Sequence, residues 1–395
     1  MIPILSKLSK RFLSIKPSSF KRFLYDEIDF GASIIGIKGG RGAGKTTLLH
    51  QYAKSRRYKP SQILYISCDH PAMINQNLYE IADEFLAHGG KLLILDEVHK
   101  IDNFASHIKA MYDFGNLQIL FSGSSAMKIE HNIGDLSRRA LIYDMPVLSF
   151  REFLSLKKIA HFPIYSLEDI LTNHEDIAIE INQEIKPLEW FGEYLEYGAY
   201  PFFKEGVSSY NNRLLEVVNV TIDSDLASLF SINSDKLDTL KKVLYMLCTT
   251  TPYEINKSKL STQAGVAWAT LSKYLEYMEK GSLIHLVRGS KGHKTLQLPN
   301  KILLNNPNLF GVLCGKPDKG ALRESFFVSQ LKTKHQIHYH YQGDFILDDK
   351  TIIEVGGKSK DNSQIKGLKN AYLAIDDIEF GYDNAIPLWL FGFLY

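Results

Sequence analysis

The sequence predicts an α/β fold built around a parallel β-sheet, and three observations lead to this fold class. Short apolar runs alternate with helical stretches between residues 31 and 148. A glycine-rich loop joins the first of these runs to a helical stretch. Hydrophobic residues make up 45% of the chain and charged residues 23%, which is typical of proteins with large buried cores. Strands that alternate with helices indicate a parallel sheet that is covered on both faces.

The length of 395 residues predicts two or three domains, and changes of pattern divide the chain further. We expect a basic N-terminal arm over 1–30, the α/β core over 31–150, a helical linker over 151–235, helices with a β-hairpin over 236–314, and a second α/β domain over 315–395. No apolar run reaches the ~20 residues that cross a bilayer, so we expect no integral membrane association.

The three cysteines, Cys68, Cys248 and Cys314, lie far apart in the sequence and show no metal-binding spacing. We therefore expect neither a disulfide framework nor a zinc site, and we expect a reducing, cytoplasmic compartment. The formal net charge of +2 does not by itself indicate a nucleic-acid-binding protein.

The first 22 residues hold six basic residues and no acidic residue, with apolar residues among them. One interpretation is a basic arm that contacts nucleic acid or an anionic membrane. The other is an amphipathic helix that docks on the α/β core.

Five apolar runs are the expected strands of the core. They are Ser33–Ile37, Ile63–Ser67, Leu92–Leu95, Leu117–Phe121 and Leu141–Tyr143.

The loop after the first strand matches the pattern GxxxxGK[ST], and the expected helix Lys45–Ala53 follows it. Glycines let backbone N–H groups converge on phosphates, and the positive end of a helix dipole adds to this attraction. In this pattern Lys45 contacts the β- and γ-phosphates, and the hydroxyl of Thr46 faces Mg²⁺. We therefore predict a site for ATP and Mg²⁺, the alternative being a plain glycine-rich turn. The expected nucleotide contacts are Gly39, Gly40, Arg41, Gly42, Ala43, Gly44, Lys45, Thr46 and Thr47.

Two carboxylates follow the strand Leu92–Leu95. At the strand end, Asp96 is expected to hold Mg²⁺ through its water shell, and Glu97 to polarise the attacking water. The alternative is a pair of acids that caps a strand. After the strand Gln118–Phe121, either Ser122 or Ser124 is expected to orient the same water, unless the segment is an ordinary turn.

Arg138 and Arg139 follow a short expected helix. An arginine there is expected to reach the γ-phosphate of a neighbouring subunit, where it would stabilise the charge of the transition state. This role requires a homo-oligomer, and we expect a ring such as a hexamer. The alternative is a surface pair.

Beyond residue 235 we expect three helices, Asp235–Cys248, Lys257–Gly265 and Trp268–Lys280, followed by two strands, Leu283–Val287 and Lys294–Leu298. This is the order of a winged helix. The third helix and the turn between the strands carry residues suited to DNA phosphates. They are Lys273, Lys280, Arg288, Lys291 and Lys294. The alternative is a structural or protein-binding role.

The last segment alternates again, with a helix near Glu324–Leu331, strands near 337–341, 344–347 and 351–355, a helical run over 364–370 and a strand over 371–375. Glu324, Asp344, Glu354 and Lys358 follow the order of a PD-(D/E)xK nuclease, which needs carboxylates on Mg²⁺ and a lysine near the attacking water. A glycine stands where the lysine belongs, and no proline precedes Asp344. We therefore expect a degenerate nuclease-like domain, with an active nuclease as the alternative.

Seven segments together are similar to one group of proteins. They are Gly39–Thr47, Leu93–Lys100, Phe121–Ala126, Leu148–Leu154, Tyr194–Phe202, Glu354–Lys360 and Ile386–Tyr395. The chain thus resembles AAA-type P-loop ATPases of bacteria and archaea that carry a winged-helix region and a C-terminal restriction-endonuclease-like domain. The resemblance implies an AAA+-like sheet and a helical lid over 151–235.

Three hypotheses follow for the use of ATP hydrolysis. The first is an oligomeric motor that binds or remodels DNA. The second is a nucleotide-dependent switch that recruits a protein partner in stress or phage defence. The third is an ATP-gated nuclease.

Overall fold

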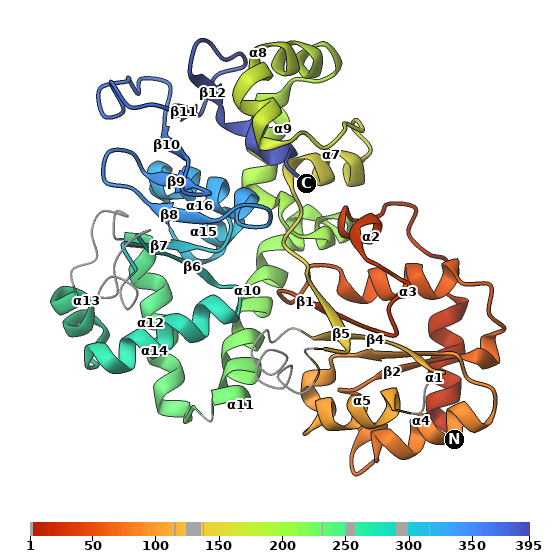
Figure 1. Cartoon of the computed structure of the whole chain (residues 1–395). Helices are drawn as coiled ribbons and strands as arrows, with labels where there is room; N and C mark the ends of the chain where they lie inside the picture. The colour runs from red at the N-terminus through yellow and green to blue at the C-terminus, as the bar shows by residue number, and fades with distance from the viewer. Residues whose placement is uncertain are drawn as a thin grey trace. The chain divides into compact units, whose positions relative to one another are not determined.

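The computed structural model describes residues 3–113, 116–123, 136, 138–230, 232–249, 257–289, 299–315 and 317–395 (Figure 1). The chain divides into two compact units, Met1–Pro146 and Val147–Tyr395. This division lies close to the expected boundary at residue 150, and the other expected boundaries stay predictions. Within the described ranges, no helix is long and apolar enough to span a membrane.

The first unit contains a five-stranded parallel sheet in the order β2-β3-β4-β1-β5. The strands are β1 (Ile34–Lys38), β2 (Ile63–Ser67), β3 (Leu92–Asp96), β4 (Gln118–Gly123) and β5 (Ala140–Asp144). All five expected strands are present, so the predicted α/β core is confirmed. The inner strand β3 is buried along its whole length, because its run of leucine and isoleucine faces helices on both sides of the sheet.

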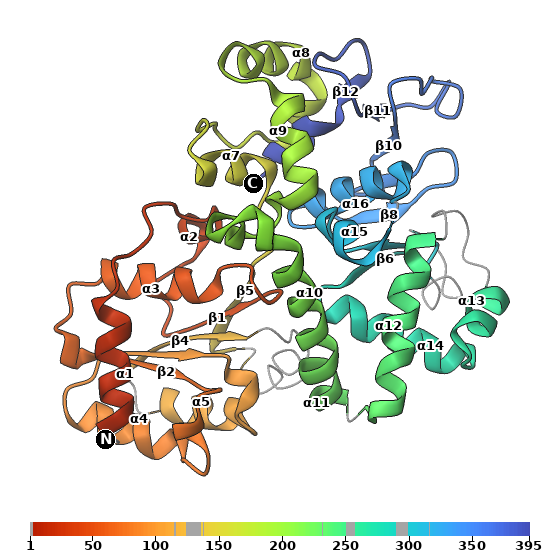
Figure 2. The same ribbon diagram turned by 180° about the vertical axis from the view of Figure 1, so that it is seen from behind.

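Helices cover both faces of this sheet. α1 (Pro3–Ser14) and α3 (Lys45–Ser55) lie on one face, and α4 (Leu78–Ala87) and α5 (Phe104–Tyr112) on the other, as Figure 2 shows from behind. Short helical turns η1 (Pro60–Gln62), η2 (Pro71–Met73) and η3 (Val98–Lys100), with α2 (Leu24–Glu27), complete the unit. Right-handed crossovers between parallel strands place successive helices in this way.

The N-terminal helix α1 packs against strand β2. Leu5 is buried, and the ring of Phe12 stacks on Tyr65 with centroids 3.7 Å apart. The hydroxyl of Ser9 donates to the carbonyl of Ile63 at 3.3 Å and accepts from the backbone N–H of Tyr65 at 3.0 Å. The structure therefore matches the docked amphipathic helix rather than a free basic arm.

The second unit begins with helices. These are α7 (Phe150–Lys157), α8 (Leu167–Glu184), α9 (Pro187–Glu193), α10 (Tyr210–Val220), α11 (Ala227–Phe230), α12 (Ser234–Thr249), α13 (Lys257–Ala264), α14 (Trp268–Lys280), α15 (Asn308–Leu313) and α16 (Lys319–Leu331). The π-helices η4 (Tyr194–Gly198) and η7 (Thr221–Leu226) and the 3-10 helices η5 (Pro201–Glu205), η6 (Val207–Ser209) and η8 (Leu388–Phe393) lie among and after them. Ser149 starts α7 with a capping box, in which its hydroxyl accepts from the N–H of Glu152 at 3.1 Å.

An antiparallel pair follows α14, formed by β6 (Ile284–Val287) and β7 (Lys301–Leu304). The order of three helices and a hairpin is the one expected from the sequence. The partner of β6 is later in the chain than predicted, and the expected strand 294–298 lies outside the described residues. The description of this segment as a winged helix stays a prediction.

The C-terminal sheet has the order β12-β11-β10-β9-β8. Its strands are β8 (Ile337–Tyr339), β9 (Phe345–Leu347), β10 (Thr351–Gly356), β11 (Ala371–Ile375) and β12 (Ala385–Pro387). The helical run expected over 364–370 is wrong, since these residues form turns. Gly367 has a φ of 81°, which a right-handed helix does not allow, and only short-range bonds such as Leu368 N–H to the Ile365 carbonyl form there.

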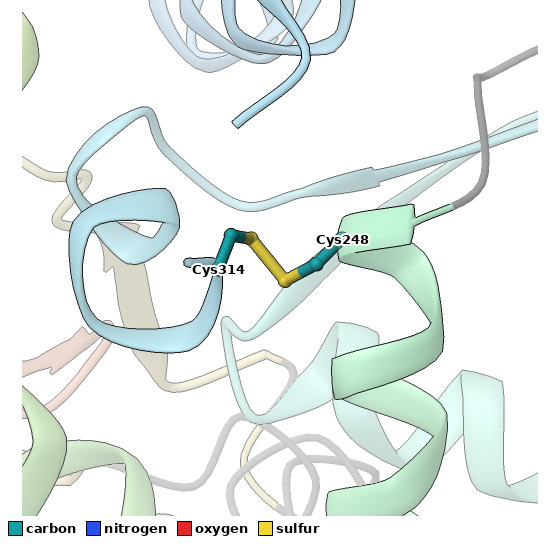
Figure 3. The surroundings of a disulfide bond; sticks show 2 residues. All are labelled: Cys248 and Cys314. Carbon is teal, nitrogen blue, oxygen red and sulfur yellow. A yellow bond between two sulfur atoms is a disulfide. The ribbon is translucent and has the colours of Figure 1, made fainter. Parts of the chain in front are cut away.

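Cys248 at the end of α12 and Cys314 just after α15 form a disulfide bond (Figure 3). The expectation that the chain has no disulfide is therefore wrong. The two cysteines are 66 residues apart in the sequence, and packing of α12 near α15 brings their Cα atoms to 5.3 Å. Cysteine spacing cannot reveal such a pairing, because it depends on tertiary packing. Cys68 remains a buried free thiol.

Candidate functional site

The loop between β1 and α3 has the backbone that its glycines predict. Gly39 has a φ of 156° and Gly44 a φ of 101°. A side chain at Gly39 would also collide with the backbone carbonyl of Met145. Glycine is thus required at the entry to the loop for two reasons, its positive φ and the close approach of another backbone segment.

Lys45 begins α3 and is only 5% exposed. Its Nζ donates to the carbonyls of Gly39 and Gly40, at 2.9 Å each. The ammonium group is therefore held over the loop, beside the N-terminus of a helix. Backbone N–H groups at a helix start and a fixed ammonium together form an anion site.

Three elements converge on the carboxylate of Asp96, which is 4% exposed at the end of β3. Its Oδ2 accepts from the hydroxyl of Thr46 at 2.7 Å and from the hydroxyl of Tyr65 at 3.1 Å. Its Oδ1 accepts from the hydroxyl of Ser122 on β4. Burial, followed by the charge of Asp96, raises the pKa of Tyr65, so this residue remains a hydrogen-bond donor. Hydroxyl and carboxylate oxygens are the ligands that Mg²⁺ prefers, and the exposed Thr46 leaves the group open to a ligand.

Glu97 lies directly after Asp96 in the left-handed region, with a φ of 55°. Left-handed backbone is uncommon for glutamate and concentrates at functional sites. Its backbone N–H donates to the Ser122 hydroxyl at 3.4 Å, and its Oε2 lies 3.2 Å from Nδ1 of His99. That contact has the distance of an ion pair without the alignment of a hydrogen bond. Sequence reasoning did not find His99 or Tyr65, because neither belongs to the pattern that selected their neighbours.

The other residues expected near the phosphates are not found beside the phosphate loop in the described part of the chain. Ser124 lies outside the described residues. Arg138 and Arg139 immediately precede β5, at the amino edge of the sheet, whereas the phosphate loop follows the carboxyl end of β1. Arg138 is exposed, and Arg139 lies 3.7 Å from Asp113. Neither arginine therefore lies beside the phosphate loop of its own chain, and a role toward another subunit stays a prediction.

A buried arginine, which the sequence did not predict as a functional residue, supports the phosphate loop. Arg22 is 5% exposed, and its Nη1 donates to the carbonyl of Ala43 at 2.6 Å. Its Nη2 donates to the carbonyl of Pro146 at 2.9 Å. In the sequence, Arg22 is one of six basic residues in a short stretch, and nothing distinguishes it from the others.

We expect Arg22→Met to weaken ATP binding by about tenfold and to lower the free energy of unfolding by about 2–3 kcal/mol. Both effects follow because buried carbonyl partners lose a charged donor. Nucleotide titration and urea unfolding measure them. Lys21→Met is the matched control, because Lys21 lies over the ring of Tyr25 at 4.1 Å and is exposed. Equal effects of the two substitutions would contradict the assigned role of Arg22.

A second charged cluster lies in the second unit, around Lys301 of β7. This lysine is 4% exposed, and its Nζ donates to Oε2 of Glu324 at 2.9 Å and to Oδ1 of Asp344 at 2.6 Å. The other carboxylate oxygen of Asp344 accepts from the N–H of Val355 at 2.8 Å. Burial raises the pKa of Glu324 to about 7, although Lys301 opposes this shift. Burial alone would lower the pKa of Lys301, but the two carboxylates outweigh it and raise that pKa.

The expected nuclease residues are thus only partly together. Glu354 pairs with Lys360, whereas Lys358, the lysine predicted from the sequence, is exposed. Lys301 was not expected in this cluster, because it lies on a different element. Its ammonium group lies between two of the three carboxylates that were predicted for the nuclease site. In the described part of the chain, no group of three His, Cys, Asp or Glu residues is placed to hold a metal ion.

The residues expected to contact DNA are described only in part. On α14, Lys273 is exposed and Lys280 is half-buried. Arg288 lies 3.7 Å from the carboxylate of Glu279, which also accepts from Lys332 at 2.8 Å. Lys291 and Lys294 lie outside the described residues. Of the described residues in this set, Lys273 is therefore the most accessible to a phosphate.

Two family models match the chain. Residues 32–154 match a family described as an AAA domain, and residues 188–319 match a domain of unknown function. The first match, together with the parallel sheet and the phosphate loop, supports a P-loop ATPase domain. The description of the second family names no activity.

The chain is also similar to two uncharacterized proteins of Methanocaldococcus jannaschii. One is 28% identical over 84% of this chain and 77% of the relative, and the other 24% identical over 88% and 80%. Among solved structures, the chain superposes on C. elegans PCH-2 with 18% identity and a TM-score of 0.23, covering 39% of this chain and 42% of the other. The chain thus spans less than half of that protein, and so loose a superposition carries no argument.

Proposed function

We propose that the first unit hydrolyses ATP to ADP and phosphate with the help of Mg²⁺. The network that joins Thr46 and Ser122 to Asp96 beside the phosphate loop carries this proposal. It places a hydroxyl and a carboxylate, both suited to Mg²⁺, next to a fixed ammonium group. Mg²⁺, when bound, supplies positive charge to the phosphate oxygens during phosphoryl transfer.

Each residue of the site has a distinct proposed role. Lys45 and the loop N–H groups bind the phosphates, and Thr46 and Asp96 hold the metal ion. Glu97 orients and deprotonates the attacking water, with His99 fixing its carboxylate at 3.2 Å. The hydroxyl of Ser122 fixes the position of the Glu97 backbone relative to the carboxylate of Asp96, because it bonds to both. Ser124, as the sequence suggested, remains a candidate for orienting the water.

The finer part of the proposal is an AAA-type oligomer, such as a hexameric ring, that acts on DNA. Exposed Arg138 at the amino edge of the sheet supports a role between subunits. Exposed Lys273 on α14 and the order of helices and hairpin support DNA contact through a winged helix. The Cys248–Cys314 disulfide favours a less reducing compartment than the one expected.

The alternatives carry different weights. A nucleotide switch that recruits a protein partner uses the same ATP site and needs no DNA contact. A nuclease needs a metal ion on its carboxylates, and the ammonium group of Lys301 already pairs with two of them, Glu324 and Asp344. The cluster therefore favours a nuclease-like domain that serves binding or assembly.

The proposed DNA role predicts that DNA stimulates ATP turnover severalfold. Phosphate release is measured with single-stranded, duplex and branched DNA and with no DNA. Lys273→Ala should remove most of the stimulation and leave the basal rate, because one exposed phosphate contact is lost. Lys204→Ala, at a lysine exposed on a different segment, is the matched control. A basal rate that no DNA form changes would favour the protein-directed switch instead.

A further inference from the structure

A cleft lies at the amino edge of the sheet in the first unit and has a volume of about 1070 Å³. Segments just before β1, β3 and β4 line it, together with the ends of α3, α4 and α5. The same three strands carry the phosphate loop, Asp96 and Ser122 near their carboxyl ends. Because the strands are parallel, the cleft and the ATP site lie at opposite edges of one sheet. A ligand in the cleft therefore does not compete with ATP.

The described charged side chains that line the cleft are all positive. Its lining includes the exposed side chains of Arg56 and Lys91, and no aspartate or glutamate is among the described residues that line it. Arg56 donates to the hydroxyl of Tyr58 at 3.1 Å. Within the described ranges, neither cation forms an ion pair with a carboxylate. Two cations without a counter-charge in a concave surface attract an anion.

Aromatic rings accompany these cations. Arg56 and Lys91 lie 5.1 and 5.6 Å from the ring centroid of Tyr58. Tyr112, which also lines the cleft, is 38% exposed, with Arg139 at 5.5 Å from its ring. The volume exceeds what one small ligand needs. Ring faces next to cations are the arrangement on which proteins stack bases while they neutralise the adjoining phosphates.

We propose that this cleft binds a segment of single-stranded nucleic acid, with Tyr58 and Tyr112 stacking on bases and Arg56 and Lys91 contacting phosphates. The ligand chemistry is a planar base joined to a phosphate. A single strand suits the cleft better than a duplex, because the bases of a duplex are stacked on each other. This site is separate from the proposed DNA contact on α14 and goes beyond the ATPase function.

The test uses the full chain and a fluorescein-labelled oligothymidylate of about 12 nucleotides, a length typical of single-strand sites. Fluorescence anisotropy gives its affinity at several salt concentrations. The double substitution Arg56→Ser with Lys91→Ser should weaken binding about tenfold, because two phosphate contacts are lost. For the same reason it should reduce the slope of log affinity against log salt concentration by about 2. Tyr58→Ser should weaken binding about tenfold at an unchanged slope, because only stacking is lost.

The matched control is the double substitution Lys7→Ser with Lys10→Ser, which removes the same charge from exposed positions on α1. It should leave the affinity within about twofold. All variants should keep the basal ATP turnover of the wild type, which shows that they are folded. If the wild type has no turnover, a cooperative unfolding transition shows independently that the variants are folded. Failure of the ATPase proposal can then be distinguished from failure of the cleft proposal.

Three results would overturn the inference. In the first, the wild type does not bind the oligonucleotide, or the cleft variants bind it as tightly as the wild type. In the second, Lys273→Ala abolishes binding while the cleft variants keep it, which assigns the strand to α14 alone. In the third, thymidine monophosphate displaces the oligonucleotide at equal concentration, which assigns the cleft to a mononucleotide.

Discussion

Glu97→Gln is expected to reduce ATP turnover by at least about 100-fold, since general-base catalysis contributes about 10²–10⁴. The amide keeps the size of the side chain but cannot take a proton from water. The left-handed backbone of Glu97 and its contact with His99 position the carboxylate. Nucleotide affinity should stay within about threefold, because Lys45 and the loop carry phosphate binding.

Lys45→Ala separates binding from chemistry. It removes the ammonium group that the Gly39 and Gly40 carbonyls hold, so ATP affinity itself should fall by about 100-fold or more. Turnover is measured by phosphate release and affinity by titration with a slowly hydrolysed analogue. Unchanged turnover in Glu97→Gln would refute the proposed base. Unchanged affinity in Lys45→Ala would refute the phosphate site.

Lys301→Met is expected to lower the free energy of unfolding by about 3–5 kcal/mol, the usual cost of removing one partner from a buried ion pair. Methionine has nearly the same length but no charge, so Glu324 and Asp344 remain buried without a cation. Urea unfolding followed by circular dichroism measures the change. Two contacts from a single ammonium group make this the largest stability effect that we expect in the chain.

Lys319→Met is the matched control, because Lys319 is exposed at the start of the neighbouring helix α16, and it should change stability by less than about 0.5 kcal/mol. Adding Glu324→Gln and Asp344→Asn to Lys301→Met should recover part of the loss, because the buried charges are then gone. A stability for Lys301→Met equal to that of the control would mean that solvent or a metal ion neutralises the two carboxylates.

Local patterns explain how much of the first unit could be predicted. The strand before the loop, the glycines and Lys45 lie within a few residues of each other, and their chemistry depends on that spacing. Asp96 and Glu97 could be identified because they end a strongly apolar strand. These features need only the direction of the chain and the period of its hydrophobic residues.

Features that depend on distant packing could not be predicted. Lys301 meets Glu324 and Asp344 only because β7 lies next to them in the second unit. Arg22 reaches the phosphate loop from the N-terminal segment. In each case the sequence shows an ordinary basic residue, and only the buried partners reveal its role.

The first unit ends where the phosphate loop is braced. The backbone N–H of Met145 donates to the carbonyl of Lys38 at 2.7 Å, and the guanidinium of Arg22 spans from Ala43 to Pro146. Pro146 is the last residue before the second unit begins. Two hydrogen bonds of one side chain thus join the phosphate loop to the peptide that leads into the rest of the protein. Arg22 therefore connects the nucleotide site directly to the segment between the two units.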